Sequence, residues 1–132
     1  ILYEQDSKTW GVIDWEWTSS GFPPLFDLFH LIFSLKFSEK DKLHDSLIDK
    51  YFQSFIDSFF CRNWFSEYVR KLVVWYCGEE CIDASKVFDY FMDSLLFIFN
   101  KYRLDYHLPE YETMHRNMIL YSLSHRAEFT VL

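Results

Sequence analysis

The stretch GVIDWEWTSSGFPPLFDL, residues 11–28, carries the features on which the fold prediction depends. Its first seven residues are mostly β-branched or aromatic, which is typical of a strand. Alternate strand side chains point to opposite faces, so Asp14 and Glu16 share one face. A buried carboxylate is costly unless it is paired or binds a cation. Asp14 is therefore a candidate metal ligand, while a solvent-facing acidic pair at a strand end remains the alternative.

The segments on either side of this stretch predict a hairpin and a buried helix. Ile1–Tyr3 and Trp10–Trp17 are apolar or aromatic runs separated by a polar loop, which indicates a hairpin. A lone hairpin is marginal in water, so we expect it to pack on the helices. Pro24 suits the first turn of a helix. Leu25–Phe37 is apolar on every side, which predicts the central core helix.

The rest of the chain has helical periodicity. Ser38 is the predicted N-cap of a second helix that ends at about Phe60. The further predicted helices are Trp64–Tyr76, capped by Asn63 and ended by Gly78, then Asp83 or Ser85 to Tyr102, and Tyr111–Ala127. The predicted fold is mainly α: a short N-terminal β-hairpin followed by about five helices, forming a single domain over residues 1–132.

Composition and charge limit the kinds of molecule that this chain is expected to bind. Asp and Glu number 20 against 13 Lys and Arg, a formal charge of −7, and no basic cluster is present. We therefore expect no nucleic-acid partner and no anionic membrane partner, and the acidic balance allows a cationic small molecule. The three cysteines have no framework spacing, which indicates reduced thiols and a cytoplasmic protein. No run approaches the roughly twenty apolar residues of a membrane span.

Three short motifs of the 11–28 stretch occur together: Val12–Glu16, Gly21–Pro23 and Phe26–Leu28. In this order they resemble the metal-binding segment of the aminoglycoside phosphotransferase and choline kinase-like family, which has a protein-kinase-like fold. Beyond Ser34 the resemblance is only architectural, to the helical C-terminal lobe of that fold. The resemblance implies an ATP-dependent phosphotransferase that acts on a hydroxyl of a small molecule. It also implies that this chain contains the metal-binding Asp and the helices that bind the substrate.

The resemblance also assigns roles to three acids. Asp14 would bind the Mg²⁺ that holds the phosphates of ATP, and Glu16 would be an auxiliary group. Asp27 would be a structural acid that accepts backbone N–H groups of the catalytic loop, or simply an acid in the first turn of a helix. The family's His-Gly-Asp catalytic loop and its metal-binding Asn have no counterpart here. No catalytic residue is therefore assigned, and the chain is expected to be a fragment that begins just after that loop and is inactive alone.

Other interpretations remain open. The chain could instead be a non-catalytic remnant or a helical interaction module of the same fold. It could also be an unrelated helical domain, in which Asp14 and Asp27 would lie far apart. The five histidines lack the i,i+4 spacing of helical metal ligands and are interpreted as satisfied or solvated. The abundant aromatic rings are interpreted as core rather than as a cage for a quaternary ammonium group.

Overall fold

The structure, a computed structural model, describes residues 2–4, 9–11, 21–39 and 47–131, with side chains described for residues 21–32 and 48–131. In chain order its strands and α-helices are β1 Leu2–Glu4, β2 Thr9–Gly11, α1 Phe26–Glu39, α2 Leu47–Phe59, α3 Trp64–Glu79, α4 Val87–Lys101 and α5 Pro109–Ser124. Short helical turns occupy Ala84–Lys86, Tyr102–Tyr106 and Arg126–Glu128. The described chain is mainly helical, as the sequence predicted.

The two strands form a short antiparallel ribbon. Leu2 pairs with Gly11, and Glu4 pairs with Thr9. The predicted second strand was longer, and its residues from Val12 to Trp17 lie outside the described part. The structure therefore does not show the hairpin in the predicted form, which was an eight-residue strand packed on the helices.

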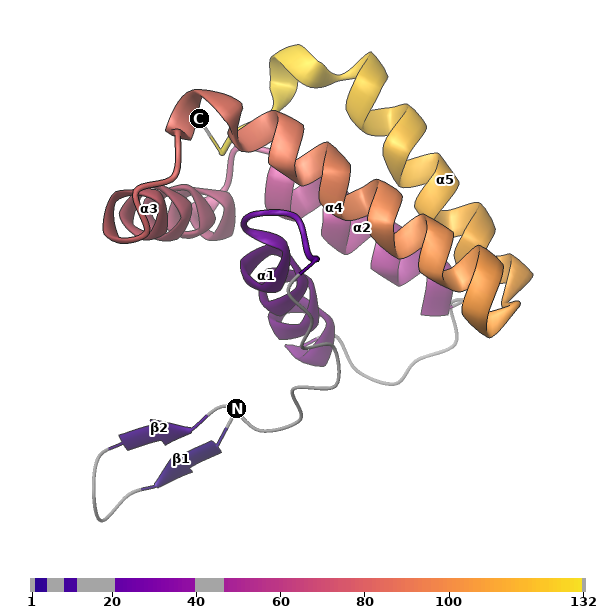
Figure 1. Ribbon diagram of the computed structural model, residues 1–132, viewed down its shortest axis with the longest axis horizontal. Helices are drawn as coiled ribbons and strands as arrows, with labels where there is room; N and C mark the ends of the chain where they lie inside the picture. The colour runs from indigo at the N-terminus through magenta and orange to yellow at the C-terminus, as the bar shows by residue number, and fades with distance from the viewer. Residues whose placement is uncertain (1, 5–8, 12–20, 40–46, 132) are drawn as a thin grey trace.

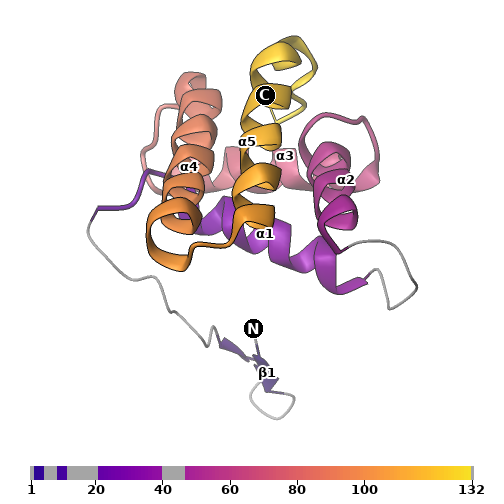
Figure 2. The same ribbon diagram turned by 90° about the vertical axis from the view of Figure 1, so that its right-hand side faces the viewer.

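Three of the helices lie side by side, and α1 crosses one face of this layer. Figure 2 shows α5 between α4 and α2, with α1 running across them. In Figure 1 the chain runs along α4 and returns along α5, so these two helices form an antiparallel pair. Helix α3 contacts α2 and lies at the end of the layer where α1 begins. One apolar core is thereby enclosed by all five helices.

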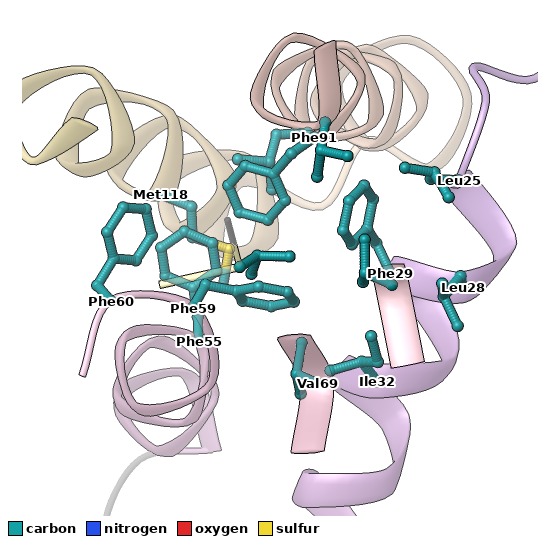
Figure 3. Close-up of a cluster of buried hydrophobic side chains, with 14 of the residues drawn as sticks. Leu25, Leu28, Phe29, Ile32, Phe55, Phe59, Phe60, Val69, Phe91 and Met118 are labelled. Atoms are coloured by element: carbon teal, nitrogen blue, oxygen red, sulfur yellow. The ribbon is translucent and has the colours of Figure 1, made fainter. Parts of the chain in front are cut away.

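Phenylalanine rings fill the centre of this core. Phe29 of α1, Phe55 and Phe59 of α2 and Phe91 of α4 are each at most 1% exposed. The ring of Phe91 lies 4.9 Å from that of Phe59 and 5.2 Å from that of Phe29, at the tilted and edge-to-face angles that aromatic pairs favour (Figure 3). Burying a side chain of this size stabilises the fold by about 1.5–3 kcal/mol.

The N-terminus of α3 confirms the predicted cap. The Asn63 side chain accepts hydrogen bonds from the backbone N–H groups of Phe65 and Ser66, both at 2.9 Å. In return, the Ser66 hydroxyl accepts the backbone N–H of Asn63 at 2.9 Å. This reciprocal capping box satisfies N–H groups that have no partner within the helix.

Three predicted helix ends are wrong. Ser38 lies inside α1, which continues to Glu39, so it is not the N-cap of α2. Pro24 precedes the helix, in a turn in which the N–H of Phe26 donates to the carbonyl of Pro23 at 3.2 Å. Gly78 lies inside α3 and does not end it. The left-handed residue that follows this helix is Cys81, with φ of 54°.

The end of α3 shows why Gly78 was not required. The N–H of Ile82 donates to the carbonyl of Cys77 at 2.9 Å across the left-handed Cys81, which is the Schellman arrangement. Ile82 then packs against the core next to the buried Cys77. This apolar contact offsets the cost of a left-handed residue other than glycine, which is on the order of 1 kcal/mol.

Candidate functional site

The two carboxylates predicted to form the metal site, Asp14 and Glu16, lie outside the described residues. The structure therefore neither places them nor tests their role. Within residues 21–32 and 48–131 no three His, Cys, Asp or Glu side chains converge into a potential metal site. The metal-binding role of Asp14 stays a prediction from the sequence.

The third predicted acid, Asp27, is described and exposed in the first turn of α1. Leu25, just before it, has φ of 66° and is buried at 5% exposure, and its carbonyl accepts the N–H of Phe29 at 2.9 Å. The turn thus buries Leu25 and leaves the carboxylate of Asp27 at the positive end of the helix dipole. The negative charge of Asp27 partly opposes the lowering of the His30 pKa by burial. Both predicted roles of Asp27 remain compatible with this position.

A small cavity lies where α1, α2, α4 and α5 meet, and we call it the tyrosine pocket. It has a volume of about 40 Å³ and is lined by His30, Tyr51, Ile98, Tyr102, Tyr111, Met114, His115 and Met118. These residues come from five different segments, because Tyr102 belongs to the turn that follows α4. The pocket combines an apolar floor with polar aromatic groups, which is the composition expected of a small-molecule site.

His115 is the buried polar group of the tyrosine pocket, at 8% exposure. Its Nδ1 lies 2.8 Å from the carbonyl oxygen of Tyr111. A carbonyl only accepts, so Nδ1 carries the proton. Burial lowers the pKa of His115 to about 4, which keeps the ring neutral at physiological pH. Nε2 is therefore a hydrogen-bond acceptor with a lone pair.

The ring of Tyr102 lies between those of His115 and Tyr111 in a short stack. Tyr102 stacks on the His115 ring at 4.9 Å and on the Tyr111 ring at 5.2 Å. Burial, and then the neighbouring hydroxyls of Tyr51 and Tyr111, raise the pKa of Tyr102. Burial, and then Tyr111, likewise raise the pKa of Tyr51. These hydroxyls are therefore close to one another and stay protonated at neutral pH.

The chain is irregular where it places Tyr102. Residues Tyr102–Tyr106 form a π-helical turn, and His107 then adopts a left-handed conformation with φ of 50°. Such π-helical turns are rare and often lie at functional sites, because they re-aim side chains. Tyr111 and His115 are four residues apart, a spacing that could have indicated that they are neighbours on one helix face, but this pair was not predicted as a site. Nothing in the sequence indicated that Tyr51 and Tyr102 would join them.

The other histidines agree in part with the prediction that they are hydrogen-bonded within the protein or solvated. Nδ1 of His125 lies 3.0 Å from the carbonyl of Tyr121, and its ring stacks on the Tyr121 ring at 3.9 Å. His107 is exposed, while His44 lies outside the described residues. His30 and His115 are different, because both line the tyrosine pocket.

A wider hollow of about 550 Å³ lies between the start of α3 and the C-terminal segment. Its charged side chains are Arg62, Glu67, Arg70 and Glu128, so positive and negative charges balance. All four are exposed to solvent. These side chains are solvated and their charges balance, whereas the tyrosine pocket has a buried histidine, so the tyrosine pocket is the stronger candidate site.

Comparison with known protein families, with curated proteins and with solved structures finds no match. None of the described helices combines the length and the apolar character needed to cross a bilayer. The functional argument therefore depends on the residues of this chain and on their geometry.

Proposed function

We propose that this chain is the helical C-terminal lobe of a kinase-like phosphotransferase, which moves the γ-phosphate of ATP to a hydroxyl of a small molecule. In this proposal Asp14 binds Mg²⁺, Glu16 assists it, and Asp27 is a structural acid that accepts backbone N–H groups of the catalytic loop. The helices provide the surface for the acceptor. No residue of this chain is assigned as the catalytic base.

The observation that carries the proposal is that α1 begins at Phe26, the first residue of the third motif. The Pro23–Phe26 turn ends the loop, and the buried helix begins at Phe26 with Asp27 exposed in its first turn. The Asp27 carboxylate is exposed at this position, where an acid can accept N–H groups of a neighbouring loop. The helical bundle that follows is of the class expected for such a lobe.

The chemistry of the three acids fits this role. Phosphoryl transfer requires positioning and neutralisation of the charge on the moving phosphoryl group, which Mg²⁺ supplies when bound. Mg²⁺ prefers one or two carboxylates together with phosphate oxygens and water. A single aspartate with a glutamate two residues further on provides ligands of this kind.

The test is Mg²⁺-dependent ATP hydrolysis by the full-length protein, comparing wild type with Asp14→Asn. We expect Asp14→Asn to lower the rate at least about a hundredfold, because a charge-stabilising group at the reacting phosphate contributes that much. Asp93→Asn, an exposed carboxylate on α4, is the matched control and should keep the wild-type rate. Full activity of Asp14→Asn would show that the metal assignment is wrong.

The second candidate, an interaction module without catalysis, is favoured by the surface of α3. Trp64, Tyr68 and Trp75 lie on one face of this helix and are 74%, 55% and 59% exposed. Large exposed aromatic patches often mark protein interfaces. Binding of ATP separates the two candidates: Mg-ATP at a hundred times its Kd should stabilise a kinase by about 2.7 kcal/mol, and should leave a pure interaction module unchanged.

A further inference from the structure

Helix α3 has an inner face that packs on the core and an outer face with large exposed aromatic rings. The inner face consists of the buried residues Ser66, Val69, Val73 and Cys77. With about 3.6 residues per turn, Trp64, Tyr68 and Trp75 lie on the opposite side of the helix, and they are 74%, 55% and 59% exposed. Figure 1 shows α3 at one end of the helical bundle, where a second molecule can approach this outer face. So much exposed aromatic surface on one helix marks an interface.

The side chains of the outer face are arranged symmetrically along the helix. The point midway between Trp64 and Trp75 is also the point midway between Tyr68 and Lys71. At about 1.5 Å per residue, each tryptophan lies about 8 Å from this midpoint along the helix axis. A second copy that runs antiparallel, with a two-fold axis through the midpoint, therefore places each Trp64 opposite a Trp75 and each Tyr68 opposite a Lys71.

The charges of the outer face are complementary in the same arrangement. Glu67 and Lys71 are exposed on the same side of this face, and in an antiparallel pair that side meets its own counterpart. Glu67 of one copy then lies within about one residue, or about 1.5 Å along the axis, of Lys71 of the other. The two-fold axis repeats this contact, and each Lys71 is also attracted to the face of the opposite Tyr68 ring.

We propose that the outer face of α3 is the interface between two copies of this chain, which pair through antiparallel α3 helices. An aromatic side chain can bury about 150–250 Å², so the exposed parts of Trp64, Tyr68 and Trp75 amount to about 450 Å² per copy. Val74, which is 52% exposed, and the stems of Glu67 and Lys71 add to this area. The sum approaches the lower end of the range for specific complexes, about 1,200–2,000 Å² in total, so we expect a Kd on the order of 1–100 µM.

Other occupants fit the outer face less well. Helix α3 contains two acidic and two basic side chains, so it has no positive surface for a nucleic acid or for anionic lipid, although the chain as a whole has a charge of −7. A different protein could cover the rings, but it would not account for the matched spacing of rings and charges. This proposal names a partner for the α3 surface and uses none of Asp14, Glu16 and Asp27. It can therefore fail while the phosphotransferase proposal holds.

The first test is sedimentation equilibrium of the full-length protein over about 1–500 µM, a range that includes the expected Kd. Trp75→Ala removes a ring from both halves of the two-fold interface, and we expect it to weaken the dimer at least about tenfold. Leu123→Ala on α5 is the matched control, because Leu123 is also 59% exposed, and it should keep the wild-type Kd. A protein that stays monomeric throughout, or an unchanged Kd for Trp75→Ala, would overturn the proposal.

The second test exchanges the charges at an ionic strength of about 50 mM, where screening is weak. Glu67→Lys and Lys71→Glu each bring like charges together twice across the two-fold axis, and each should weaken self-association at least about tenfold. An equimolar mixture of the two variants restores opposite charges and should associate more strongly than either variant alone. Both variants lose the same possible pairing within their own helix, so only contacts between copies can produce this gain. A general effect of net charge would instead put the mixture between the two variants, and that result would overturn the antiparallel pairing.

Discussion

Replacing Phe91 by alanine should remove about 4 kcal/mol of stability. Phe91 is 0% exposed, and its ring contacts the aromatic rings of both neighbouring core helices and of the C-terminal segment. The ring centroids within 6.4 Å belong to Phe29, Phe55, Phe59, Phe60, Phe88 and Phe129. Truncation of a buried Phe costs about 3–5 kcal/mol, through lost burial and the cavity left behind. With so many ring partners, we expect Phe91 to fall well within this range rather than at its lower end.

The assay is thermal and urea unfolding followed by far-ultraviolet circular dichroism. For a domain of this size about 3–4 °C of Tm corresponds to 1 kcal/mol, so Phe91→Ala should lower the Tm by roughly 12–16 °C. The control is Leu96→Ala on the same helix, where the side chain is 43% exposed and the loss should stay below about 1 kcal/mol. A loss below about 2 kcal/mol for Phe91→Ala would refute the packing of the phenylalanine core.

Three further outcomes are expected from the local geometry. Asn63→Ala removes the cap of α3 and should cost about 1 kcal/mol in urea unfolding, while Asn63→Asp should retain most of it. His115 has a folded pKa of about 4 against 6.5 when unfolded, so protonation favours the unfolded state. Its contribution is complete above pH 6.5 and is lost as the pH falls toward 4, about 2 kcal/mol of it between pH 7 and 5. His115→Gln should remove this part of the pH dependence of unfolding, and an unchanged slope would contradict the burial of the neutral ring. A thiol reagent should modify the exposed Cys81 in the native protein, and should reach Cys77, which is buried and has a raised pKa, only on unfolding. Equal rates for these two thiols would contradict the described end of α3.

The helices could be predicted because their apolar residues recur at three- and four-residue steps. The predicted starts at Trp64 and near Asp83 agree with the structure to within a few residues, since Asn63 and Asp83 cap their own backbones locally. The end of α3 could not be predicted. Cys81 adopts the left-handed conformation because Ile82 packs against the core. That packing involves residues distant in sequence.

The candidate sites also differ in whether the sequence could predict them. Asp14 and Asp27 could be proposed from the sequence because strand alternation and a short motif are local signals, and only Asp27 is described in the structure. The tyrosine pocket could not be proposed, since His30, Tyr51 and Tyr102 reach it from three separate segments. Their meeting is a consequence of how the helices cross, which periodicity within one helix does not encode.

The C-terminal segment closes the core by binding back to the end of α2. The backbone N–H and the hydroxyl of Thr130 both donate to the carbonyl of Phe59, at 2.9 and 3.0 Å, and Val131 is 0% exposed. These partners are 71 residues apart, so bringing them together costs about 4 kcal/mol of loop-closure entropy in an otherwise unfolded chain. The antiparallel pair of α4 and α5 requires a far shorter loop. Folding should therefore begin with this pair, and the capture of the Thr130 segment by α2 should be among its last steps.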